Sequence, residues 1–407
     1  MQLADPGQED RKSRGIPVVP VFDGYRAVAI FGIVLLHLTA AGPGGETWFR
    51  IQTATLGQAI DILFIVSGFV VFLPTAAQGK FGSVKSYAVR RAARLLPAYW
   101  MILLIVLLLG VIGPPLSPVF HPPLQAIALH ISGFQTVGFF WETFGAAGFG
   151  VIGPIWTLTV EISFYLVLPL VAMSFYRHPA IGLVIAGAIG VAWAWLGTHP
   201  FQVADFLDTS ITLDAGGNIY RSTLLQFPFW IFSFALGMMG AKVYVKALTM
   251  DPGRVRRIAA RAQLVALAFL LFFAVLVYHV DPGGGGIFLV AEDARTNPLI
   301  MLGYSSALAV LMVSIALGPE WVKRPFDNRP VRWLAEISYG VYLSHMMFVW
   351  IALWGIGYTY GGDMASLAAW IGAVVPLSML YGYLSARFLE QPIRRWVRKY
   401  GREPKPG

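Results

Sequence analysis

An arginine and a histidine lie eleven positions apart in the apolar segment 22–37. On an α-helix, eleven steps of 100° make three turns plus about 20°, so Arg26 and His37 project from one face, about 16 Å apart along the axis. Ionisable groups are costly inside a bilayer and usually have a function there. We therefore expect this helix to present a guanidinium and an imidazole to the interior of a helical bundle.

Two other apolar segments carry carboxylates at a depth that we expect to be close to that of His37. They are Asp61 in the segment 55–74 and Glu161 in the segment 154–175. A carboxylate beside an imidazole orients the ring and raises its basicity, so either residue could make His37 a general base. A helix–helix hydrogen bond is the structural alternative for Asp61. Arg26, His37 or a proton could satisfy Glu161, and the sequence leaves this choice open.

Three arginines, Arg90, Arg91 and Arg94, come just before the apolar segment 96–112. Arg90 and Arg94 are four residues apart and would share a helix face. Their forked, permanently charged side chains suit phosphate groups. Positive charge that only fixes the topology of a membrane protein explains the cluster equally simply.

The segment 333–354 carries Tyr339, Tyr342 and His345 at intervals of three, so they drift across one helix face. This stripe could line a substrate path, or His345 could be a structural histidine. No pair of histidines has the His-x-x-x-His spacing of a helical metal site, and cysteine is absent. We therefore expect no metal site and no thiolate chemistry.

The composition is that of an integral membrane protein. Of the 407 residues 57% are hydrophobic and 13% are charged, whereas soluble domains have roughly 25% charged residues. The net charge of +9 comes from basic residues placed between apolar runs, which does not favour a nucleic-acid surface. We expect a multi-pass protein whose surroundings are the lipid bilayer.

The apolar segments predict an all-α fold with about ten transmembrane helices. A further apolar segment, 124–140, is interrupted by polar residues and is predicted to be surface-lying or re-entrant. We divide the chain into a tail, 1–19, a transmembrane domain, 20–390, and a basic tail, 391–407. The ten predicted spans are 24–42, 55–74, 96–112, 154–175, 180–197, 223–242, 263–280, 298–317, 333–354 and 366–388.

The distribution of basic residues predicts that both termini are cytoplasmic. With ten spans and the N-terminus inside, 26 of the 30 lysines and arginines fall on the inner side, as the positive-inside rule requires. The first span could instead be a cleaved signal peptide, but its length is that of a membrane span. We expect a multi-pass protein of the inner (plasma) membrane.

Taken together and in order, several motifs resemble those of the membrane-bound acyltransferase family 3, whose members O-acylate bacterial polysaccharides and macrolides. Small departures are Ala59 and Ile60, where Gly-Val is usual, and Leu63 in place of a phenylalanine. The matching elements are Arg26-x10-His37, Asp61 to Phe69, Arg90-Arg91-x-x-Arg94 with Pro97, Trp156 to Pro169 around Glu161, Ile337 to His345, and Glu390-x-Pro392.

The resemblance implies transfer of an acyl group from a coenzyme A thioester to a hydroxyl. It implies that Arg26 and His37 form the core of the site with Glu161 beside them, and that Arg94 belongs to the donor region. Some members carry an extra soluble hydrolase-like domain, which the sequence up to residue 407 does not contain.

Our working hypothesis has His37 as the general base, oriented by Asp61 or Glu161, and acyl-CoA held near Arg90, Arg91 and Arg94. The acceptor would be a hydroxyl of a glycan or of a glycosylated small molecule. A covalent acyl-histidine is a variant of this mechanism. The alternatives from other classes are a proton-coupled transporter, a flippase for lipid-linked sugars, or a structural membrane partner.

Overall fold

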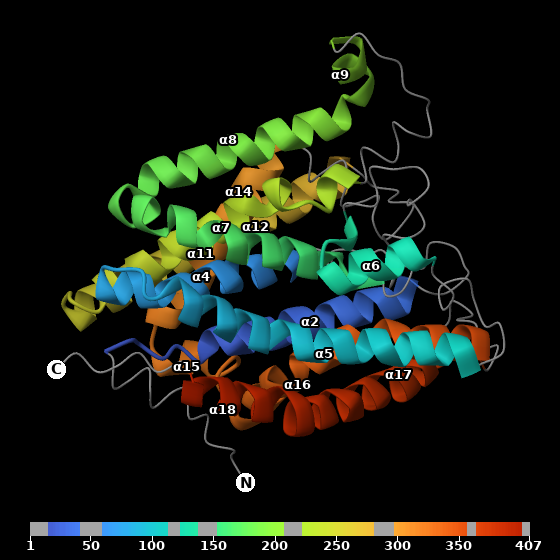
Figure 1. The fold of residues 1–407 in the computed structure, drawn as a ribbon. Coiled ribbons are helices and arrows are strands. Elements are labelled where there is room, and N and C mark those ends of the chain that lie inside the picture. The colour runs from blue at the N-terminus through green and yellow to red at the C-terminus, as the bar shows by residue number, and fades with distance from the viewer. Residues whose placement is uncertain are drawn as a thin grey trace.

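The computed structural model describes residues 15–40, 59–112, 123–136, 153–206, 222–280, 297–355 and 364–400. These residues form helices joined by short links, and no β-strand occurs among them (Figure 1). The all-α prediction is confirmed. Parts of both predicted tails, 1–14 and 401–407, lie outside the described residues.

Ten long helices within the described residues match the ten predicted spans. Eight of these regions are long and apolar enough to cross a membrane. The other two helices, α12 and α16, begin with turns rich in arginine. The ten helices are α2 (Val21–Ala40), α4 (Ala59–Gln78), α5 (Val84–Ile112), α7 (Trp156–Arg177), α8 (Pro179–Thr198), α11 (Phe227–Ala247), α12 (Pro252–Val280), α14 (Pro298–Leu317), α16 (Arg329–Trp350) and α17 (Met364–Leu384).

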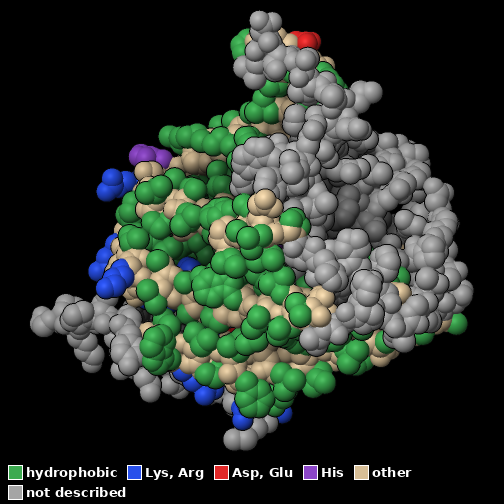
Figure 2. Space-filling model, turned by 45° about the vertical axis from the view of Figure 1, so that its right-hand side comes forward, with side chains coloured by type: hydrophobic (Ala, Val, Ile, Leu, Met, Phe, Trp, Pro, Cys, Tyr) green, Lys and Arg blue, Asp and Glu red, His purple; other side chains and the backbone are tan. Residues whose placement is uncertain are grey.

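Successive helices run in opposite directions, and short links join them at one end of the bundle (Figure 1). Basic residues occur in and beside these links, and Figure 2 shows lysine and arginine gathered along this side, next to an apolar surface. We call this end the basic end. It is defined by Lys80, Lys85, Arg177, Lys246 and Arg324. The predicted location of this end in the cytoplasm stays a prediction.

The helices α4 and α11 cross in direct backbone contact at the centre of the bundle. A Cβ atom on Gly68 would lie 2.1 Å from the carbonyl oxygen of Phe234, and one on Gly237 would lie 2.1 Å from that of Ile65. Small residues allow such close crossings in membrane bundles. This crossing fixes which side of α4 faces α11, and therefore where the polar residues of α4 point.

Shorter helices complete the described part of the chain. Within the predicted segment 124–140, α6 (Leu124–Ser132) is nine residues long, too short to span a bilayer. The hydroxyl of Tyr99 on α5 donates to the backbone carbonyl of His130 on α6 at 2.6 Å. At the basic end, α15 (Glu320–Lys323) precedes α16, and a π-helical turn (Ser385–Glu390) joins α17 to α18 (Gln391–Tyr400), which begins the predicted basic tail.

Candidate active site

The central feature of the site is a pair of histidines from α2 and α16. Nδ1 of His37 lies 3.0 Å from Nε2 of His345, and the two ring centroids are 5.1 Å apart. His345 is fully buried, while His37 keeps some accessible surface. The sequence left open whether His345 lines a substrate path or is a structural histidine, and it did not predict that it pairs with His37.

The hydrogen bonds of His345 determine the tautomers of both rings. Nδ1 of His345 lies 2.7 Å from the carbonyl oxygen of Tyr342. A carbonyl oxygen only accepts, so this Nδ1 carries a proton and Nε2 of the neutral ring accepts. Nδ1 of His37 must then be the donor between the rings, which leaves the lone pair of His37 on its Nε2.

Nε2 of His37 is available to a substrate. It has no hydrogen-bond partner among the described residues. It is also absent from the unpartnered side-chain atoms that are fully buried in this part of the chain, so it keeps some accessible surface. An unprotonated, accessible imidazole nitrogen held in a fixed tautomer is the arrangement that a general base requires.

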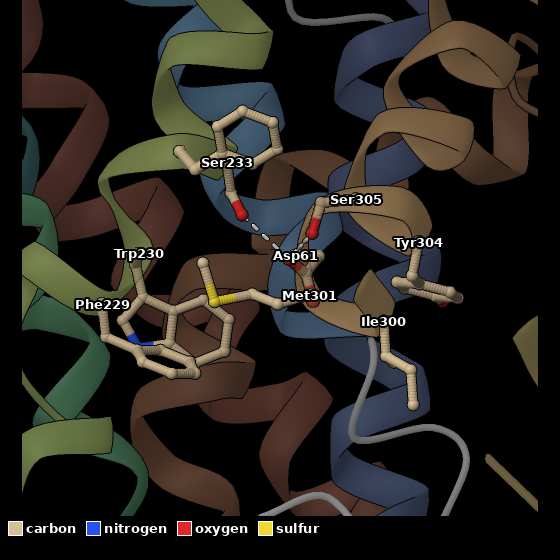
Figure 3. Close-up of a pocket in the computed structure, with 9 residues that line it drawn as sticks. Asp61, Phe229, Trp230, Ser233, Ile300, Met301, Tyr304 and Ser305 are labelled. Carbon is tan, nitrogen blue, oxygen red and sulfur yellow. Dashed lines mark hydrogen bonds between the residues drawn. The ribbon is translucent and has the colours of Figure 1, made fainter. Parts of the chain in front are cut away.

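The expected contact between Asp61 and His37 is wrong. Asp61 instead accepts hydrogen bonds from Ser233 on α11 and Ser305 on α14, each 2.8 Å long (Figure 3). The cause is the register of α4: positions 61 and 63 differ by 200° around the helix. Leu63 packs into the apolar cluster formed with α2 and α16, so Asp61 faces the other way.

Glu161 also has partners other than His37. Ser67 on α4 donates to its Oε1 at 2.7 Å, and the hydroxyl of Tyr165, one turn along α7, donates to the same oxygen. Glu161 is close enough to attract both Arg26 and Arg94 electrostatically. Of the partners that the sequence left open for Glu161, the structure therefore places Arg26 near it.

Arginines from two helices meet around Glu161. Arg26 forms an ion pair with Asp23 at 3.4 Å, and its side chain is 17% exposed. Arg94 lies near enough to Arg26 to repel it, and it has no hydrogen bond or ion pair with any described residue. Arg26 is therefore paired with Asp23, whereas Arg94 lies near Glu161 without a direct hydrogen bond to it, so its N–H groups could bind an anion such as a phosphate.

The three predicted arginines of α5 do not act as one group. The guanidinium of Arg91 lies over the rings of Tyr87 and Tyr165, 5.7 and 5.5 Å from their centroids, and its buried Nε has no partner. Arg90 is exposed and donates to Ser86. Arg91 and Arg94 therefore belong to the inner cluster, whereas Arg90 points outward.

The two tyrosines of the predicted stripe connect helices. The hydroxyl of Tyr339 donates to the Leu95 carbonyl on α5 at 2.9 Å. The hydroxyl of Tyr342 donates to the Pro154 carbonyl at 2.6 Å and lies 2.7 Å from the hydroxyl of Thr157. Tyr339 therefore contacts the helix of the arginine cluster, while Tyr342 fixes the turn that holds His345.

These groups occupy two levels of one bundle. The histidine pair lies toward the end opposite the basic end, and the arginine cluster lies about 16 Å along α2 from it. Among the described residues, no three His, Cys, Asp or Glu side chains come together as a metal site would need. The fold and these groups define a polytopic helical membrane protein with an arginine cluster and an accessible imidazole inside it.

The chain belongs to a known family: residues 19–387 match the family model described as "Acyltransferase domain". A peptidoglycan O-acetyltransferase of Listeria monocytogenes is 24% identical over 402 residues, which are 93% of this chain and 56% of that protein. A putative O-acetyltransferase of Staphylococcus aureus is 23% identical, over 94% of this chain and 58% of that protein. The chain thus spans little more than half of these relatives.

A relative of similar length also matches. Nodulation protein 10 of Rhizobium leguminosarum bv. viciae is 24% identical over 390 residues, which are 91% of this chain and 92% of that protein. No solved structure was found to match the chain. The family predicted from the motifs is confirmed.

Proposed function

We propose that this protein is a membrane O-acyltransferase that moves an acetyl group from acetyl-CoA to a hydroxyl of a glycan or of a glycosylated small molecule. Membership of the acyltransferase family supports the reaction class, as do the names of two relatives, a peptidoglycan O-acetyltransferase and a putative O-acetyltransferase. The single observation that carries the mechanism is the accessible Nε2 of His37, whose tautomer His345 fixes.

The proton and acyl transfers follow from this arrangement. Nε2 of His37 removes the proton of the acceptor hydroxyl while the hydroxyl oxygen attacks the thioester carbonyl. The carbon–sulfur bond then breaks, an oxygen ester forms, and the departing thiolate takes the proton from the imidazolium. Neutral His37 is restored, and CoA leaves as the free thiol.

The arginine cluster is assigned to the donor rather than to the reacting carbonyl. Arg26 lies about 16 Å along α2 from His37, too far for both to touch one carbonyl group. Phosphate groups of CoA held by Arg26, Arg91 and Arg94 would leave the long pantetheine arm to extend along the bundle toward the histidines. The basic end would then face the cytoplasm of a bacterium, where acyl-CoA is made, with the protein in the inner (plasma) membrane.

The experiment is an acetyl-transfer assay on the full chain in lipid nanodiscs with radiolabelled acetyl-CoA and cell-envelope glycans as acceptors. We expect release of free CoA together with a labelled ester that is lost on mild alkaline treatment. The His37→Gln variant should bind acetyl-CoA and give no label. Sugar or proton transport in vesicles without any acyl transfer would overturn the proposal in favour of a transporter.

A further inference from the structure

A small polar cavity lies on the side of α4 that faces α11 and α14. Its volume is about 20 Å³, which is room for about one water-sized group. Asp61, Ser233, Ser305 and Tyr304 line it together with aromatic and aliphatic side chains (Figure 3). The cavity can therefore accept a single hydroxyl group but not a whole sugar ring.

Asp61 leaves one acceptor open toward this cavity. Ser233 and Ser305 both donate to Oδ1, and Oδ2 has no partner among the described residues. Oδ2 is not one of the fully enclosed, partnerless atoms, so it keeps accessible surface. None of the ion pairs of the described residues involves Asp61. A carboxylate oxygen without a partner costs free energy inside a membrane protein, and a hydrogen-bond donor from a ligand would remove this cost.

An apolar groove of about 900 Å³ adjoins the cavity. Residues 183–196 of α8 form one side of it, a length of about 20 Å at 1.5 Å per residue. Phe232 of α11 and Leu302 of α14 form the other side. Every lining side chain is apolar, and α8 stands at the edge of the bundle in Figure 1. A groove of this length and character, on helices that can span a membrane, suits an aliphatic lipid chain.

The cavity and the groove share a wall. Phe232 lines both, and Met301, which lines the cavity, is followed by Leu302, which lines the groove. Gly187 lies between these walls, because a Cβ atom there would be in van der Waals contact with both Phe232 and Leu302 at 3.4–3.5 Å. Trp195 is half-exposed near the C-terminal end of α8, and Asp61 lies in the first turn of α4. Both positions are toward the end of the bundle opposite the basic end. Tryptophan favours the level of the lipid headgroups.

We propose that the cavity and groove form a binding site for a membrane lipid with a neutral, hydroxyl-bearing head. The aliphatic chain lies along α8, and the hydroxyl donates to Oδ2 of Asp61. An anionic head is rejected because two negative charges in a medium of low dielectric constant repel strongly. The site faces away from His37, so this inference does not depend on the proposed acyl transfer.

Photolabelling of the full chain in nanodiscs tests the site with two matched probes. One is a diacylglycerol with a diazirine in its acyl chain, and the other is phosphatidic acid with the same chains. Mass spectrometry of the labelled peptides should place the diacylglycerol on residues 183–196 at least fivefold more often than phosphatidic acid. Equal labelling by both probes would mean ordinary boundary lipid and would overturn the proposal.

Variants separate the two parts of the site. Ala188→Phe fills the groove and should remove the label, whereas Ile185→Phe, on the exposed face of α8 outside the groove, should leave it unchanged. Asp61→Asn keeps an oxygen acceptor but removes the charge, so phosphatidic acid should then label as well as diacylglycerol. If Ala188→Phe fails to fold, Val184→Trp at the exposed edge of the groove replaces it. Undiminished labelling in a folded groove variant would overturn the site.

Discussion

Nδ1 of His37 and Nε2 of His345 lie 3.0 Å apart, and the second ring is anchored through its Nδ1 to the Tyr342 carbonyl. From the sequence, a carboxylate is expected to orient the ring of His37. In this bundle His345 does so instead, because it holds the imidazole of His37 in one orientation and one tautomer. A neutral partner of this kind places no charge beside the base.

Replacing His37 by alanine should abolish most of the acetyl transfer. General-base catalysis typically contributes about 10²–10⁴-fold, so we expect a loss of this size in kcat with little change in thermal stability. His178→Gln is the control, since His178 is exposed at the junction of α7 and α8. Both variants should be measured for acetyl transfer in nanodiscs, and full activity of the alanine variant would remove His37 from the mechanism.

Replacing His345 by glutamine should preserve more activity than replacing it by alanine. The side-chain oxygen of glutamine reaches the position of Nε2 and can accept from Nδ1 of His37, whereas alanine leaves this donor without a partner. We expect kcat to fall about tenfold or more in the alanine variant, because His37 would then carry its proton on Nε2 in part of the molecules and could not act as a base there. The glutamine variant should retain most of kcat.

Nitrogen-15 spectra of histidine-labelled protein provide a readout that a purely structural role of His345 would not change. The signals of His37, assigned by their loss in His37→Gln, should show a protonated Nδ1 in the wild type and in His345→Gln. The alanine variant should show a mixture of tautomers. A protonated Nε2 on wild-type His37 would contradict the arrangement derived from the hydrogen bonds.

Replacing Arg94 by glutamine should weaken the binding of acyl-CoA. Arg94 is inside the bundle and has no hydrogen bond or ion pair with a described residue, so its N–H groups are available to a phosphate group. A charge-assisted hydrogen bond is worth about 1.5–3 kcal/mol, which predicts a rise in KM for acetyl-CoA of about tenfold or more. Arg90→Gln is the matched control, because Arg90 is exposed on the same helix, and its KM should stay near that of the wild type.

The sequence was sufficient for the class of fold, the ten long helices and the family, because hydropathy and motif order are local properties. It could not predict the partners of His37, Asp61 and Glu161. Equal depth brings residues to the same level of a bundle, but the rotation of each helix decides which of them meet. For α4 that rotation is set by the close contact of Gly68 and Gly237 with α11, and neither glycine carries a signal that identifies its partner.

Alanine at Gly68 or Gly237 should therefore destabilise the protein and reduce activity. In each case the new Cβ atom would lie 2.1 Å from a backbone oxygen of the facing helix, so α4 and α11 must move apart. Overpacking of this kind costs about 1–3 kcal/mol. Gly372→Ala in α17 is the control, because its added methyl group would meet nothing within 4 Å beyond its chain neighbours and the backbone of its own helix, and alanine favours the helix by roughly 1 kcal/mol. Midpoints of thermal unfolding in one detergent should fall for the first two variants and stay level or rise for the third. Equal midpoints for all three would show that the close crossing of α4 and α11 does not contribute to stability.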